Sequence, residues 1–263
     1  MDEYRTLSYP ITLTTAQLSF LLALVHAEHL FGAGNQKLFL EDTERQAHLW
    51  KIGEQQLRQD GWLMKEGQFD NPNAQLLSLV ATAATAKIVV ISEITNTRQL
   101  VQGVTHYVSN KLIVEVVYDG ELYQLTALDS LEVMVNRLAY TFDLPPIKQS
   151  DIVFRMTQTQ IRQLQSETVD VDAVLTSHLS ERAIRFYMNT MRHLERKGMI
   201  QFVRIEAKQE IAHRQVGVLV ASDGIALTAI PHQQQTNYQS VDIGSFQHLL
   251  MDTVMQLRGN DNV

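Results

Sequence analysis

The sequence has 263 residues, of which 45% are hydrophobic and 19% are charged, so the chain can bury a sizeable core and is not composed like a disordered protein. Its net charge of -7 argues against a molecule whose whole surface binds a phosphate backbone. The absence of cysteine excludes disulfides, thiolate zinc sites and cysteine nucleophiles.

The N-terminal stretch MDEYRTLSYP is acidic and polar, whereas an export signal begins with basic residues and continues into an apolar run. The longest apolar stretches, such as LSFLLALV, are far shorter than the ~20 residues that a membrane-spanning helix requires. We therefore expect a cytoplasmic protein without a membrane span.

The first half of the chain predicts helices, then an antiparallel hairpin, then a closing helix. LTTAQLSFLLAL begins with a capping threonine, and a second helix ends at LRQDGWL, where Gly61 suits the left-handed conformation that closes helices. A third helix is expected in NPNAQLLSLVATAATA, with Pro72 in its first turn, followed by strands in KIVVISEI and VTHYV. Asp119-Gly120 predicts a hairpin turn, and DSLEVMVNRLAYTF predicts the amphipathic closing helix.

The second half, after the Pro145-Pro146 pair, repeats these signals in the same order. MTQTQIRQLQSE again begins a helix with a threonine, and LERKGMI places Gly198 where LRQDGWL places Gly61. Asp223-Gly224 predicts the second hairpin, GSFQHLLMDTVMQL predicts its closing helix, and HQQQTNYQ between them is typical of an exposed loop.

These parallels predict an α+β fold with a quasi-twofold internal duplication around an antiparallel sheet. The pseudo-repeats are residues 1–146 and 147–263, the second being shorter, and we expect them to form one continuous structural domain.

The sequence offers no set of residues typical of catalysis. His26 and His29 in HAEH lie three residues apart on a predicted helix, but no third metal ligand accompanies them, and exposed histidines at a helix end explain the pattern. Neither a nucleophile elbow nor a phosphate-binding glycine loop occurs. We predict a protein that is not an enzyme and that uses no metal or cofactor.

One basic segment supports an alternative function. A helix capped by Ser180 runs into a strand, as in a winged-helix DNA-binding protein, and carries Arg182, Arg185, Arg192 and Arg196. The corresponding helix of the first half, EDTERQAHLWKIGEQQLRQD, is acidic, and arginines near a helix C-terminus also suit the helix dipole. We therefore do not expect nucleic acid as the main partner, and a DNA-binding regulator is the alternative.

The order of the elements, from LTTAQLSFLLAL through LRQDGWL and YDGELYQLTAL to the shorter second half, resembles the ESX secretion-associated chaperones of type VII secretion, the EspG-type proteins. The resemblance covers about Leu13 to Leu257. It implies a central antiparallel sheet flanked by helical bundles. It also implies a cytosolic protein that binds a helical secreted partner, a PE-PPE pair or another export substrate. The oligomeric state stays open.

The resemblance further implies that a loop between early strands contacts the partner. The corresponding segment is TNTRQLVQGVTHYV, Thr95 to Val108, where large apolar residues stand among turn-forming ones. A loop packed against its own sheet has the same composition. The candidate partner-binding residues are Leu100, Val101, Val104 and Tyr107.

Overall fold

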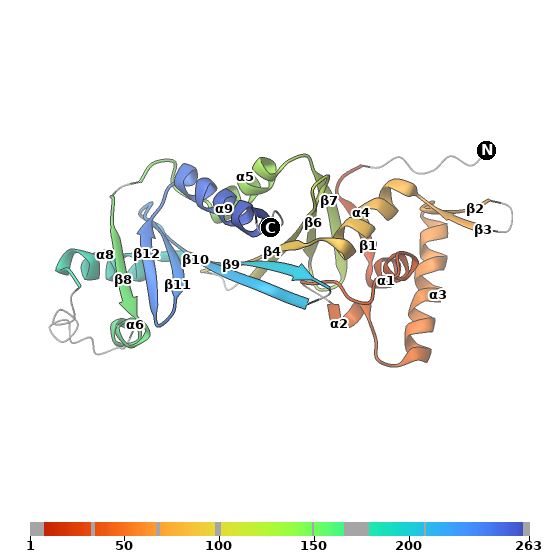
Figure 1. Cartoon of the computed structure of the whole chain (residues 1–263), viewed down its shortest axis with the longest axis horizontal. Helices are drawn as coiled ribbons and strands as arrows, with labels where there is room; N and C mark the ends of the chain where they lie inside the picture. The colour runs from red at the N-terminus through yellow and green to blue at the C-terminus, as the bar shows by residue number, and fades with distance from the viewer. Residues whose placement is uncertain are drawn as a thin grey trace. The chain divides into compact units, whose positions relative to one another are not determined.

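A computed structural model describes residues 8–32, 35–66, 69–97, 101–148, 150–165, 179–207 and 209–259. The helices and strands in these ranges are labelled in Figure 1. In chain order they are β1 (Ile11–Thr14), α1 (Thr15–Leu24), α2 (Asn35–Leu38), α3 (Thr43–Gln59), β2 (Leu63–Glu66), β3 (Phe69–Pro72), α4 (Ala74–Thr85), β4 (Ile88–Asn96), β5 (Val101–Val108), β6 (Ile113–Tyr118), β7 (Leu122–Leu128), α5 (Leu131–Phe142), β8 (Val153–Thr157), α6 (Gln158–Gln165), α8 (Glu181–Arg192), β9 (Leu194–Glu206), β10 (Gln209–Ala221), β11 (Ala226–His232), β12 (Gln235–Ser240) and α9 (Ile243–Arg258).

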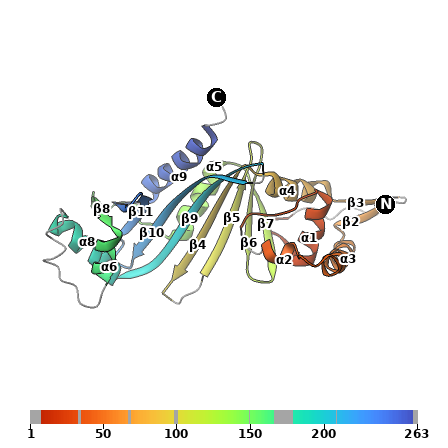
Figure 2. The same cartoon turned by 60° about the horizontal axis from the view of Figure 1, so that its bottom comes forward.

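The described strands form a ten-stranded antiparallel sheet in the order β1-β7-β6-β5-β4-β9-β10-β11-β12-β8, and β2 pairs with β3 in a separate hairpin. Figure 2 shows β4 and β5 running side by side, as this order requires. The predicted α+β class with a central antiparallel sheet is confirmed.

The chain divides into two compact units that exchange segments. The first unit comprises Met1–Ile91, Gly103–Met134 and Val203–Ala212, and the second comprises Ser92–Gln102, Val135–Phe202 and His213–Val263. The strand order places β1 and β8 at the two ends, followed inward by β7 and β12, β6 and β11, β5 and β10, and β4 and β9. Each strand thus has a counterpart at the same distance from the middle of the sheet. The duplication with its boundary after residue 146 stays a prediction.

The first unit is held together by a core beneath α1, α3 and α4. Thr14 caps α1, because its hydroxyl accepts a hydrogen bond from the Gln17 N–H (3.2 Å) and its own N–H donates to the Gln17 side chain (2.8 Å). Helices α1 and α3 meet at Gly53, where an added Cβ would lie 2.0 Å from the Ala16 carbonyl oxygen. Only glycine permits this close approach. The buried core includes Leu18, Leu22, Leu57, Leu76 and Val80.

The second unit has its own core, which joins α6 and α8 to strands β8, β11 and β12. Phe154 of β8 stacks on Tyr238 of β12 with ring centroids 5.1 Å apart, and Tyr187 of α8 packs edge-on against both rings. Elsewhere in this unit, Phe142 of α5 contacts Phe246 of α9, with centroids 5.8 Å apart. Aromatic pairs in these geometries add to the stabilisation that burial of their area provides.

Both predicted hairpin turns are confirmed. Asp119-Gly120 joins β6 to β7, and Asp223-Gly224 joins β10 to β11, each with the glycine at positive φ (104° and 79°). The Asp119 carboxylate accepts hydrogen bonds from the N–H groups of Glu121 and Leu122, and these bonds lower the pKa of that carboxyl. Aspartate followed by glycine therefore folds locally, as the sequence indicates.

The two copies of the repeated heptapeptide have different structures. Gly61 has φ 74° and follows the end of α3, as predicted. Gly198 instead lies inside strand β9, because α8 already ends at Arg192. An added Cβ at Gly198 would lie 2.5 Å from both the Glu93 carbonyl oxygen and the Phe142 ring. The prediction that Gly198 closes a helix is wrong, since close packing requires that glycine.

Two further local predictions are wrong. HQQQTNYQ, expected as an exposed loop, contains most of strand β12, in which Thr236 and Tyr238 are buried while their neighbours are polar and accessible. Pro72 ends strand β3 rather than beginning a helix, and Asn73 caps α4 by accepting hydrogen bonds from the N–H groups of Gln75 and Leu76. For HQQQTNYQ, pairing with neighbouring strands favours a strand in spite of the polar composition.

Candidate protein-binding surfaces

The four candidate partner-binding residues differ in position. Leu100 lies outside the described residues, and Val101 begins strand β5, although its side chain is outside the description. Val104 and Tyr107 lie within β5 and are only 6% and 1% exposed. In its described part, the segment Thr95 to Val108 consists mainly of the end of β4 and the whole of β5, and Val104 and Tyr107 have no surface to offer a partner.

Tyr107 instead anchors its strand to the core of the first unit. Its hydroxyl donates a hydrogen bond to the Phe31 carbonyl oxygen, and its ring belongs to the core cluster beneath α1 and α4. Burial raises the pKa of this hydroxyl far above its usual range, so the group stays protonated and remains a donor. The strand predicted in VTHYV is part of β5, and of the two readings that the sequence left open for this segment, packing against the protein's own sheet holds for Val104 and Tyr107.

A buried polar pair lies on the same strand. His106 of β5 faces Glu115 of β6 in the strand register, and their side chains, 1% and 7% exposed, approach to 3.0 Å between Nε2 and Oε2. Among the described atoms the His106 Nδ1 has no hydrogen-bond partner. The burial of both groups prevents contact with a substrate, so the pair fits a structural role better than acid–base catalysis.

The four arginines of the alternative DNA-binding site do not form one basic surface. Arg185 pairs with Glu181, and Arg196 lies beyond the helix in β9, 3.1 Å from Asp143. Arg182 donates to the Ser150 hydroxyl at 3.4 Å, and Arg192 is exposed at the end of α8. Ser180 caps this helix as predicted. Because acids neutralise two of the four charges, the site offers less attraction to phosphate than the sequence suggested.

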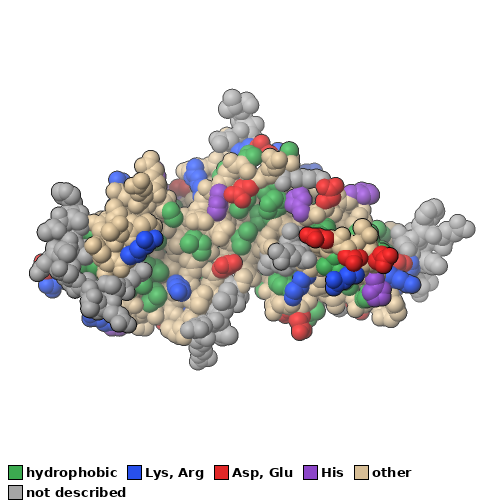
Figure 3. Space-filling view, turned by 90° about the horizontal axis from the view of Figure 1, so that it is seen from below, with side chains coloured by type: hydrophobic (Ala, Val, Ile, Leu, Met, Phe, Trp, Pro, Cys, Tyr) green, Lys and Arg blue, Asp and Glu red, His purple; other side chains and the backbone are tan. Residues whose placement is uncertain are grey.

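The face shown in Figure 3 has a mixed charge pattern, with Lys and Arg side chains interspersed among Asp, Glu and His. His26 and His29 line one hollow of about 490 Å³ in the first unit, together with Glu28 and Lys87. Within the described ranges, no three His, Asp or Glu side chains lie close enough to hold a metal ion. No helix of the described part is long and apolar enough to cross a membrane.

Comparison with solved structures finds a similar fold. The chain superposes on the Mycobacterium tuberculosis type VII secretion system chaperone EspG5, solved in complex with a PE25-PPE41 dimer, with a TM-score of 0.63. The match covers 92% of this chain and 94% of that chain at 10% sequence identity. The chain shares the fold of a secretion chaperone. No family model and no curated protein sequence matches the chain.

Proposed function

We propose that this protein is a non-enzymatic secretion chaperone that binds a helical export substrate. The observation that carries the proposal is the similarity in fold to a chaperone over 92% of the chain. The buried pair His106 and Glu115 is inaccessible to a substrate, so we assign it a structural role in this proposal.

The proposed partner is a helical protein or protein pair. The structural relative is bound to a PE25-PPE41 dimer. We propose a partner of the same kind here, a helical export substrate with an apolar surface that the chaperone covers until export.

The proposed contact is the segment of the chain that links β4 to β5, with Leu100 and Val101 as the apolar residues that touch the partner. Strands β4 and β5 are paired in the sheet, and the buried Val104 and Tyr107 fix β5 from within.

Affinity capture tests the proposal. The tagged full chain is used to capture partners from its native host at moderate salt, and bound material is identified by mass spectrometry and checked for nucleic acid by absorbance. We expect wild type to capture a helical protein, and Leu100→Asp combined with Val101→Asp to lose it. Val133→Asp is the matched control, because Val133 is partly exposed in the first turn of α5, where a helix dipole tolerates an acid.

Val104→Asp is unsuitable as a binding variant. It would place a charge at a buried position in β5 and lower the free energy of unfolding by about 4 kcal/mol. Thermal unfolding must therefore show that the Leu100→Asp, Val101→Asp variant folds like wild type. Capture of nucleic acid that is released as salt rises, and that depends on Arg182 and Arg192, would contradict the proposal and favour the DNA-binding alternative.

A further inference from the structure

Strand β8 forms one edge of the sheet and pairs only with β12 among the described strands. The Ser240 N–H donates to the Ile152 carbonyl oxygen at 3.0 Å, and the register continues with Tyr238 opposite Phe154. Hydrogen-bonded residues alternate along an antiparallel strand. The backbone groups of Ile152, Phe154 and Met156 therefore face β12, and those of the residues between them face outward.

The outward groups are not all available. The Thr157 N–H donates to the Gln160 side chain at 2.7 Å, so the first turn of α6 satisfies it. Val153 and Arg155 remain, and no described strand pairs with their outward N–H and C=O groups. An edge of this kind is a template for one more strand.

The side chains beside this edge include exposed apolar groups. Val153 is 72% exposed, whereas its neighbours Phe154 and Met156 are buried in the core of the second unit. Ile147, in the segment that leads into β8, is 77% exposed. The exposed Val153 side chain is thus available for apolar contact with a strand paired at this edge.

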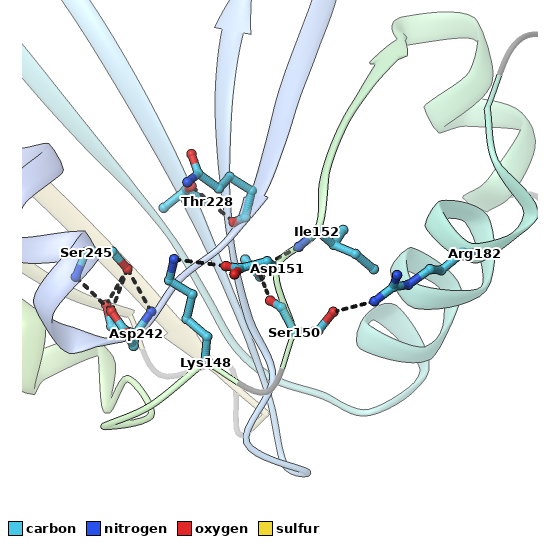
Figure 4. Close-up of polar contacts among 10 residues, drawn as sticks. Lys148, Ser150, Asp151, Ile152, Arg182, Thr228, Asp242 and Ser245 are labelled. Carbon is cyan, nitrogen blue, oxygen red and sulfur yellow. Dashed lines mark hydrogen bonds and ion pairs between the residues drawn. The ribbon is translucent and has the colours of Figure 1, made fainter.

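The charges near the edge are predominantly basic, in contrast to the net charge of -7 for the whole chain. Figure 4 shows Arg182 pointing from α8 toward Ser150, and Lys148 paired with Asp151 at 3.2 Å. Arg182 and Ser150 line a hollow of about 610 Å³, which Ile152, Arg185 and Phe186 also line.

Two acids of this region, Asp151 and Glu181, already have cationic partners, and a third, Asp242, lies near Lys148. Asp151 pairs with Lys148 and Glu181 pairs with Arg185, which leaves Arg155 and Arg182 without an acidic partner in the described part of the chain. Among the described residues, Arg155 and Arg182 therefore remain to pair with acids of a partner.

We propose that the open edge of β8 binds an extended acidic segment of a partner protein as an added strand. The outward groups of Val153 and Arg155 would form the ladder hydrogen bonds, Val153 would contact apolar side chains, and Arg155 and Arg182 would pair with the partner's acids. A second copy of this chain fits less well, because its β8 edge would bring the same two arginines against Arg155 and Arg182. This surface involves residues other than Leu100 and Val101, which we propose as the contact with the export substrate.

Fluorescence anisotropy tests the proposal with the full-length chain and a fluorescein-labelled ten-residue peptide of alternating Glu and Val. We expect saturable binding that a Lys-Val peptide of the same length does not show. Val153→Pro removes the outward N–H and should weaken binding about tenfold, whereas Val153→Ala, which keeps the N–H, should weaken it less.

Charge reversal provides a second variant. Arg155→Glu combined with Arg182→Glu should weaken binding of the Glu-Val peptide about tenfold or more. The matched control is Arg45→Glu combined with Lys51→Glu, two exposed positions of α3, which should leave binding unchanged.

Three results would overturn the proposal. The first is no binding of the Glu-Val peptide, or equal binding by Val153→Pro. The second is tighter binding of a labelled single-stranded oligonucleotide that depends on the same two arginines, which would indicate a phosphate site. The third is a dimer of wild type by light scattering that Val153→Pro converts to a monomer, which would make a second copy the occupant. None of these variants changes Leu100 or Val101, so failure here is separable from failure of the chaperone proposal.

Discussion

The two edge strands of the sheet, β1 and β8, lead into helices through the same capping arrangement but meet different surroundings. Thr14 and Gln17 exchange two hydrogen bonds at the start of α1, and Thr157 and Gln160 do the same at the start of α6. Local sequence determines both strand-to-helix junctions, because a threonine and a glutamine three residues later satisfy each other's backbone N–H groups.

The helices that follow these caps differ in burial. More than half of the α1 residues are buried, and the Gln17 side chain also donates to Asp60 at 2.6 Å. α6 is polar, with Thr159 and Arg162 exposed and Leu164 buried. The same local motif can thus form part of a core or lie at the surface, depending on what packs against it.

The edges themselves also differ. Pro10 lies four residues before Thr14, as Val153 lies four residues before Thr157, so the two residues occupy equivalent positions. Pro10 has no N–H, whereas Val153 has one that faces outward. Proline before β1 is a common way to protect a sheet edge from further pairing. β8 lacks this protection, which is why we assign a partner strand to it.

Among the paired substitutions that follow, the largest expected effect on stability tests the close packing where α1 meets α3. Gly53→Ala should lower the free energy of unfolding by about 3 kcal/mol, because the new Cβ would collide with the Ala16 carbonyl. Gly103→Ala, where an added Cβ meets nothing within 4 Å, should change it by less than about 0.5 kcal/mol. Chemical denaturation measures both, and equal effects would show that α1 and α3 do not pack as described.

The two capping threonines, Thr14 and Thr157, test whether the same local arrangement contributes different amounts to the free energy of unfolding at a buried and at a more exposed helix start. Thr14→Ala should cost about 2 kcal/mol, because the Thr14 hydroxyl also donates to Gln56 of α3 at 2.7 Å. Thr157→Ala should cost about 1 kcal/mol at the more exposed corner. A larger loss for Thr157→Ala in urea unfolding would contradict the comparison.

The closing helices of the two halves should differ in pH dependence. Asp242 caps α9, and hydrogen bonds from Ser245 lower the pKa of its carboxyl, whereas Ser130 begins α5 by accepting from the Val133 N–H. A lowered folded-state pKa gives stability that is present above the unfolded carboxyl pKa of about 3.9 and is lost as pH falls through the folded value.

Asp242→Ala should therefore cost about 1 kcal/mol at pH 7, and this difference from wild type should shrink below about pH 4. Ser130→Ala should show a difference that does not change over the same range. Thermal unfolding from pH 7 to pH 3 measures both, and a constant difference for Asp242→Ala would show that its charge is not involved.

The smallest expected effect on stability is that of Val153→Pro. Because the Val153 N–H faces away from β12, its loss should change the free energy of unfolding by less than about 0.5 kcal/mol. A loss above about 2 kcal/mol would show that this N–H is already used within the chain, and would remove the basis for an open edge.

Sequence reasoning succeeded where local chemistry decides the structure. Asp119-Gly120, Asp223-Gly224 and the capping threonines need only their neighbours to fold as predicted. It failed where partners distant in sequence decide. Gly198 has a sequence context similar to that of Gly61, but it is needed because the Phe142 ring leaves no room for a Cβ at this position.

The same limit applies to the candidate site. Tyr107 and Val104 carry no local sign of burial, since their covering arises from elements far along the chain. The open edge at Val153 was likewise not predictable, because the position of a strand within a sheet depends on the whole topology.

The central claim, that this protein acts as a chaperone for a helical partner, is tested most directly by co-expression. The partner identified by affinity capture is expressed alone, with wild type, and with the Leu100→Asp, Val101→Asp variant, and its soluble fraction is measured. The account predicts that wild type raises this fraction severalfold and that the variant does not. A partner that is equally soluble alone would contradict the chaperone function even if it binds.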